Sequence, residues 1–140
     1  MMEYGVIYLK LIPKEGNLSW IKYCHIYGAL PIPIQDGIKK VVDTINNEYK
    51  DDIIIPMGLD AQIGCIVTPE SVRKISETIF GMYSVMLHSL DVRPDVRVVY
   101  SVGDINNVNV GSIHQVSHDD VMVKVGRYLD SSDESGIFKI

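Results

Sequence analysis

The segment from Asp52 to Val67 constrains the fold of this chain more than any other. Two apolar runs, 53–55 and 63–67, flank a short segment of glycine and polar residues. Short β-branched runs on either side of a Gly/Asp turn predict a β-hairpin whose strands are both largely buried. Gly58 can adopt the positive φ that such a turn often needs, and Asp60 tolerates turn geometry. The hairpin is either purely structural or a rigid support that holds the Asp60 carboxylate at its tip for metal or phosphate chemistry.

Size and composition indicate the class of protein. The chain has 140 residues, 46% hydrophobic and 22% charged, which is typical of one globular domain, here residues 1–140. A net charge of −5 argues against a nucleic-acid partner, since binding to phosphates needs a basic surface. The two cysteines lack zinc spacing, so we expect reduced thiols, with Cys65 packed in a buried strand. Without a signal-peptide pattern or an apolar run of membrane length, we expect a cytoplasmic protein that has no membrane partner.

The hydrophobic periodicity divides the first two thirds of the chain into strands and helices. A nearly continuous apolar run predicts a strand from about Glu3 to Ile12, with Lys10 as the single charge in its interior. Lys10 either snorkels at the strand end or belongs to a site. Asp36 is expected to cap an amphipathic helix, and Thr68 and Pro69 to start a second one. The apolar stripes of the two helices are Ile38, Val41, Val42, Ile45 and Tyr49, and Val72, Ile75, Ile79, Tyr83, Met86 and Leu90.

The last third of the chain gives a less regular pattern. We predict a strand over Val96–Val102, closed by Gly103-Asp104, and an edge strand or β-rich connection over Val108–Val116. Residues 117–130 fit a helix, although their alternating valines also permit a strand. Gly136–Ile140 is expected to form a short terminal strand. The helical alternative has an inner face of Val121, Val125, Tyr128 and Leu129.

The order of these elements indicates a fold class. At its centre is βαββαβ, the split-βαβ pattern of ferredoxin-like and palm folds. We therefore predict an α+β protein, a two-layer α/β sandwich in which helices pack on a mostly antiparallel sheet.

Several short segments match one known family in order. Gly58-Leu59-Asp60-Ala61 lies at the predicted hairpin, and Tyr27-Gly28 precedes it. Ser101-Val102-Gly103 ends the following strand, and the segment from Asp120 to Arg127 leads into Gly136 and a short strand. Together they resemble the GGDE, Tyr-Gly, S-(I/L/V)-G and C-terminal helix motifs of the palm shared by GGDEF diguanylate cyclases, archaeal GTP cyclohydrolase III and CRISPR polymerase palms. The resemblance implies a nucleotide ligand.

The resemblance also implies which residues form the site. Arg127 falls where the family has a phosphate-contacting lysine, and Cys24-His25 stands near its guanine-reading pair. The residues that it implies for ligand binding are Gly58, Asp60, Lys10, His25, Ser101 and Arg127.

The chain departs from an active palm at its acidic residues. Active palms hold a divalent metal between carboxylates of the first strand and the hairpin, near the nucleotide phosphates. Here the first strand reads Tyr8-Leu9-Lys10-Leu11, and Ala61 stands where the cyclases carry an acid. Asp60 is the single candidate catalytic residue, with Asp104 or Glu15 as a second ligand if Mg²⁺ binds. The resemblance therefore implies a degenerate palm.

Three functions fit this reading of the sequence. The first is a regulatory module that binds a nucleotide or cyclic nucleotide with weak or no catalysis. The second is a Mg²⁺-dependent enzyme of the cyclase or cyclohydrolase type, which acts on a nucleoside triphosphate through Asp60. The third is a structural ferredoxin-like domain that forms homo-oligomers, for example through a sheet edge. A metal site of His114, His118, Asp119 and Asp120 is a weaker alternative, because a helix that begins at Ser117 explains the same residues.

Overall fold

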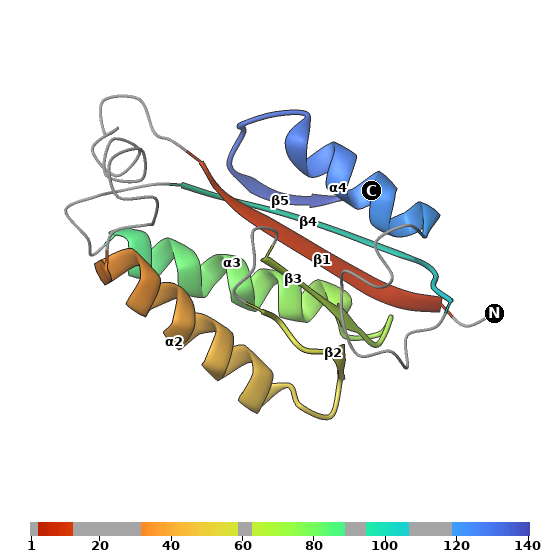
Figure 1. The fold of residues 1–140 in the computed structure, drawn as a ribbon, viewed down its shortest axis with the longest axis horizontal. Coiled ribbons are helices and arrows are strands. Elements are labelled where there is room, and N and C mark those ends of the chain that lie inside the picture. The colour runs from red at the N-terminus through yellow and green to blue at the C-terminus, as the bar shows by residue number, and fades with distance from the viewer. Residues whose placement is uncertain (1–2, 13–31, 59–62, 89–94, 107–118) are drawn as a thin grey trace.

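The computed structural model describes residues 3–12, 32–58, 63–88, 95–106 and 119–140 (Figure 1). Within these ranges, a five-stranded sheet has the order β2-β3-β1-β4-β5 and is accompanied by three helices. The strands are β1 (Glu3–Ile12), β2 (Ile53–Ile55), β3 (Ile63–Val67), β4 (Asp95–Asp104) and β5 (Gly136–Lys139). The helices are α2 (Ile32–Glu48), α3 (Val72–His88) and α4 (Asp120–Asp130).

The strand pairing is that of a ferredoxin-like core with one addition. β1 pairs antiparallel with both β3 and β4, and β2 pairs antiparallel with β3. β5 pairs parallel with β4, which requires the crossover that α4 provides. The predicted α+β class, with helices on a mostly antiparallel sheet, is confirmed.

The two faces of the sheet are covered by different helices. Alternate β1 residues point to opposite faces, so Ile7 and Leu9 pack with α2 and α3, whereas Val6 and Tyr8 pack with α4. In Figure 1, α4 lies across the sheet from α2 and α3. The predicted two-layer sandwich thus describes the β1–β4 core, and α4 adds a third layer, because the crossover from β4 to β5 passes over the other face.

The central hairpin forms as predicted. Ile53 pairs with Val67 and Ile55 with Ile66, with an irregularity between the two pairs. β3 lies inside the sheet and is largely buried, whereas β2 is an edge strand whose Ile54 is 39% exposed. The prediction of two largely buried strands is therefore correct for β3 and wrong for β2. The turn residues 59–62 lie outside the described residues.

Two helices begin at positions other than those predicted. α2 begins at Ile32, so Asp36 lies within the helix and does not cap it. Pro33 is compatible with this start because proline is tolerated in the first turn of a helix. α3 begins at Val72, after a turn in which the Ser71 N–H donates to the Thr68 carbonyl oxygen (3.2 Å). Most of the predicted stripe residues of both helices are buried: Ile38, Val41, Val42, Ile45, Tyr49, Val72, Ile75, Ile79 and Tyr83.

The C-terminal third settles the alternatives left open by its sequence. Residues Asp120–Asp130 form a helix, and Gly136–Lys139 form the terminal strand. Val121, Val125 and Leu129 lie on the buried face of α4 as predicted, but Tyr128 is 39% exposed because it lies at the edge of that face. The predictions for residues 13–31 and 108–116 fall outside the described residues. Within the described ranges, no helix has the length and apolar character of a membrane span.

Candidate functional site

The hairpin strands and the end of β1 that carries Lys10 share one end of the sheet. Ile63, the first residue of β3, pairs with Leu9 of β1. Gly58 is exposed, at the end of the described segment that follows β2. Asp60 and His25, which the resemblance implies in the site, lie outside the described residues.

Asp104 lies at the opposite end of the sheet. Its partner on β1 is Glu3, whereas the partner of Lys10 is Arg97. Seven residues of strand separate the two β1 positions, or about 23 Å at the usual rise per residue. The structure therefore does not bring Asp104 to the strand ends that border residues 59–62. Among the described residues, no three His, Cys, Asp or Glu side chains gather in a way that could hold a metal ion.

Ser101 has a structural partner at the end of the chain. Its side chain is 1% exposed, and its hydroxyl donates to the Ile140 carbonyl oxygen at 2.7 Å. The Ile140 N–H in turn donates to the carbonyl oxygen of Tyr100 at 3.0 Å. These bonds extend the parallel pairing of β4 and β5 past the end of β5.

Arg127 lies beside a hollow between α4 and β1. This hollow has a volume of about 380 Å³, and its lining residues are Tyr8, Met122, Val123, Gly126, Arg127, Asp130 and Ser131. The exposed Arg127 guanidinium is thus placed near a buried phenol, a hydroxyl and a carboxylate. Such a set can bind an anionic group and its hydrogen-bonding neighbours.

The Tyr8 ring lies against two glycines. A Cβ atom on Gly64 of β3 would stand 2.2 Å from the ring, and one on Gly126 of α4 would stand 3.8 Å from it. Gly64 is therefore required for the ring to lie flat on the sheet, whereas Gly126 leaves room beside it. Burial raises the pKa of the Tyr8 phenol above its usual 10.0, so the group is neutral at physiological pH. A neutral phenol can both donate and accept hydrogen bonds.

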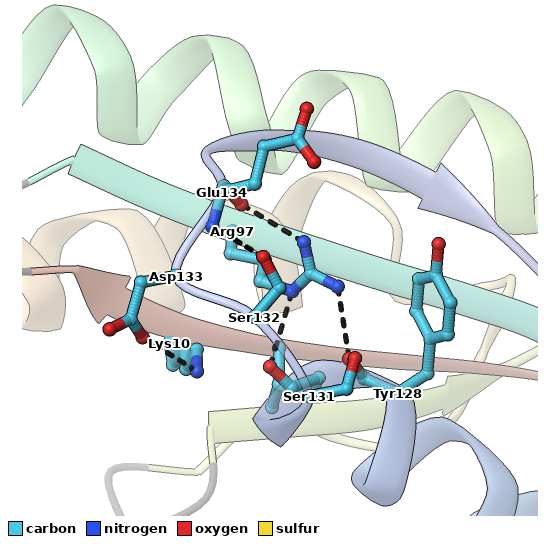
Figure 2. Close-up of polar contacts among 8 residues, drawn as sticks. Lys10, Arg97, Tyr128, Ser131, Ser132, Asp133 and Glu134 are labelled. Carbon is cyan, nitrogen blue, oxygen red and sulfur yellow. Dashed lines mark hydrogen bonds and ion pairs between the residues drawn. The ribbon is translucent and has the colours of Figure 1, made fainter.

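The sequence analysis missed Arg97, the largest fully buried side chain among the described residues. Figure 2 shows its guanidinium among backbone oxygens of the last turn of α4 and of the loop that follows it. Nε donates to the Leu129 carbonyl oxygen (3.2 Å), Nη2 to that of Tyr128 (2.9 Å) and Nη1 to that of Glu134 (3.0 Å). The cation also faces the Tyr128 and Phe138 rings, 5.1 Å and 4.3 Å from their centroids.

The environment of Arg97 explains how a charge is tolerated in this position. The carbonyl oxygens at a helix C-terminus carry partial negative charge, and aromatic faces attract cations. Arg97 therefore joins the end of α4, the loop after it and β5 through one side chain. An arginine inside an apolar strand was the sequence signal, because a charge in a buried strand needs dedicated partners.

Lys10 reaches the same loop from β1. Its ammonium lies 3.2 Å from Asp133 Oδ1, and the two side chains are 25% and 72% exposed (Figure 2). The long aliphatic stem thus runs along the sheet while the charged end reaches the rim, as the snorkelling interpretation predicted.

No protein-family model matches the sequence, and no curated protein matches it. A comparison with solved structures finds a bacterial light-regulated adenylyl cyclase, with a TM-score of 0.48 and 10% sequence identity. The match covers 92% of this chain and 69% of the cyclase chain. A similarity at this level assigns neither a family nor an activity to the chain.

Proposed function

We propose that this chain is a regulatory module that binds a nucleotide or cyclic nucleotide on a palm-like fold, with weak or no catalysis. The observation that carries the proposal is the hollow between α4 and β1, where Arg127 and Tyr8 come together from two different elements. The order of strands in the ferredoxin-like core supports a palm-like fold.

The polar groups of the hollow suit a phosphate-bearing ligand. A guanidinium can donate two parallel hydrogen bonds to a phosphate, and it stays charged at every physiological pH. The neutral Tyr8 phenol can donate a further bond. Gly126, without a side chain, leaves the space beside the phenol open to a ligand. The apolar lining by Met122 and Val123 offers a surface for a less polar part of the same molecule.

The residues of β1 favour binding over catalysis. Metal-dependent phosphoryl chemistry uses carboxylates to hold the cation beside the reacting phosphate. Between Gly5 and Ile12, β1 contains no carboxylate, and Lys10 occupies its polar position near the hairpin. A cation at this position attracts a phosphate and repels a metal ion.

Titration of the protein with GTP, ATP and cyclic dinucleotides, followed by calorimetry and thermal denaturation, tests the proposal. We expect at least one ligand to raise the melting temperature, since a ligand at 100 times its Kd stabilises by about 2.7 kcal/mol. Arg127→Ala should lower the affinity for that ligand at least about tenfold, because it removes a charge-assisted contact. Arg73→Ala, which removes an exposed arginine on α3, is the matched control and should leave affinity unchanged.

The result that would overturn the proposal is a wild-type protein whose melting temperature responds to none of these ligands. A second measurement addresses catalysis: incubation with GTP or ATP and Mg²⁺ or Mn²⁺, followed by chromatography of the products. If the wild type forms a product and the Asp60→Ala variant does not, the chain is an enzyme rather than a regulatory module.

A further inference from the structure

Two cations stand directly opposite each other beside the hollow. Lys10 of β1 and Arg97 of β4 are cross-strand partners, and both side chains point to the α4 face. Like charges in directly opposite positions of an antiparallel pair repel each other. This end of the sheet therefore needs negative groups close to it, and the segment from 128 to 134 provides them.

The two cations are satisfied to different degrees. Arg97 is 1% exposed, and three backbone oxygens and two aromatic rings surround it. Its charge is therefore already satisfied by contacts within the fold. Within the part of the chain that the structure describes, Lys10 pairs with the carboxylate of Asp133, whose side chain is 72% exposed. An ion pair this exposed is weak and exchanges readily with water and salt. Lys10 is therefore the cation that another anion can reach.

Each partner of the ion pair follows, by two positions, a residue that lines the hollow. Tyr8, which lines the hollow, precedes Lys10 by two residues and points to the same face, about 6.6 Å away along the strand. Ser131, which also lines the hollow, precedes Asp133 by two residues. A lysine ammonium on its flexible four-carbon stem can move over such a distance. Lys10 and Arg127 thus approach the hollow from β1 and α4, respectively.

We propose that Lys10 is a second anion subsite of this hollow, and that Asp133 occupies it as an internal competitor until a ligand with several phosphate charges displaces the carboxylate. This inference rests on the proposed function of the hollow and narrows its ligand to a nucleoside di- or triphosphate. A cyclic mononucleotide carries one phosphate charge, which Arg127 alone can match. A polyphosphate chain carries further charge for Lys10.

The strength of the ion pair determines how much Asp133 weakens binding. Because an exposed pair contributes little, its displacement costs a ligand less than about tenfold in affinity. Asp133→Asn removes the competitor and leaves Lys10 opposite Arg97 with no carboxylate between them. The positive potential at the hollow then rises, and a multiply charged ligand gains more from it than a singly charged one.

Calorimetry on the full chain with GTP and ATP, and with cyclic GMP and cyclic AMP as singly charged counterparts, tests the inference. Asp133→Asn should tighten binding of a triphosphate about three- to tenfold and change binding of a cyclic mononucleotide less than about twofold. Glu134→Gln is the matched control: it removes the same charge one residue away, from a carboxylate that points away from Lys10 (Figure 2). It should change triphosphate affinity less than about twofold.

A Lys10→Met variant completes a double-mutant cycle. It should weaken triphosphate binding by itself, and in its background Asp133→Asn should no longer improve affinity. Equal triphosphate affinity in the wild type and Asp133→Asn would overturn the inference and leave the proposed function intact. Failure of both proteins to bind any of the four nucleotides would overturn the inference, and a wild type that also fails to bind the cyclic dinucleotides would overturn the proposed function. Binding by Asp133→Asn alone would require an effect far larger than tenfold and would contradict the weak, displaceable ion pair on which the inference rests.

Discussion

The two faces of the sheet carry similar apolar residues, but helices cover them in different ways. On the face of α2 and α3, two helices of 17 residues each lay aliphatic stripes on the sheet. On the other face, a single helix of 11 residues leaves hollows beside it, and a buried arginine joins its end to the sheet. The difference suggests that aliphatic burial stabilises the α2/α3 face, whereas a buried cation holds α4 on the other face and leaves the hollow beside it open to a ligand. Each prediction below separates these roles.

The largest expected effect on stability comes from substitution of Arg97, the buried cation that joins the end of α4 to the sheet. Arg97→Met should lower the free energy of unfolding by about 3–4 kcal/mol, because it removes the guanidinium donor from the Leu129 and Glu134 carbonyl oxygens, while that of Tyr128 keeps the Ser131 hydroxyl as a donor. Urea denaturation measures the loss. Arg73→Met, at an exposed position on α3, should stay within about 0.5 kcal/mol of the wild type. A loss below about 1 kcal/mol would show that water replaces the guanidinium at these oxygens.

A core truncation on the α2/α3 face comes next. Ile45 is 0% exposed and belongs to the buried stripe of α2, so Ile45→Ala should lower the free energy of unfolding by about 3 kcal/mol through lost burial and a cavity. Ile54→Ala removes the same atoms from the exposed edge strand and should cost less than about 1 kcal/mol. Similar losses of stability in the two variants would contradict the view that buried aliphatic side chains on the α2/α3 face stabilise the fold.

The pH dependence of stability isolates one group on the α2/α3 face. Burial raises the pKa of the Cys65 thiol from 9.0 to about 12, so the unfolded chain loses this proton at lower pH than the folded one. The stabilising contribution of the neutral thiol is complete below pH 9 and is lost as the pH rises towards 12. Tyr8 and Tyr83, whose pKa values are also raised by burial, add the same trend above pH 10.

Urea denaturation between pH 9 and 10 therefore reports mainly on Cys65. The wild type should lose up to about 1.4 kcal/mol more than Cys65→Ala across this unit of pH, although the variant is the less stable protein at neutral pH. The comparison concerns slopes, so the cavity left by the substitution does not affect it. Parallel pH profiles for the two proteins would show that the thiol is not buried as the structure places it.

The sequence predicted those parts of the fold that depend on local pattern. β-branched runs located the hairpin strands, and helical spacing located the stripes of α2 and α3, because burial repeats with the period of each element. The start of α2 was missed because Asp36 was taken as its cap, whereas the helix begins at Ile32 and its first turn tolerates Pro33. Pattern alone did not predict the role of Asn46, whose side-chain amide exchanges two hydrogen bonds with the Met57 backbone, at 2.9 and 3.0 Å.

The candidate site was harder to predict because its contacts join distant parts of the chain. Arg97 bonds to oxygens 31 to 37 residues away, and Lys10 pairs with a residue 123 positions later. Neither contact follows from periodicity, since the partners lie at the end of α4 and in the loop that follows it. Arg127 was implied by resemblance, and the structure places it beside a hollow; the relation of that hollow to Tyr8 and its two glycines required coordinates.

The smallest expected effect on stability concerns the residue that matters most for the proposed ligand. Lys10→Met should change the free energy of unfolding by less than about 0.5 kcal/mol, because its ion pair with Asp133 is exposed and weak. The aliphatic part of the side chain, which contacts the sheet, is largely kept by methionine. Urea denaturation at low and high salt measures the change. A loss of more than about 2 kcal/mol would place Lys10 with Arg97 among the residues that hold the fold together, and among the described residues Arg127 would then be the cation beside this hollow that is left to bind a ligand.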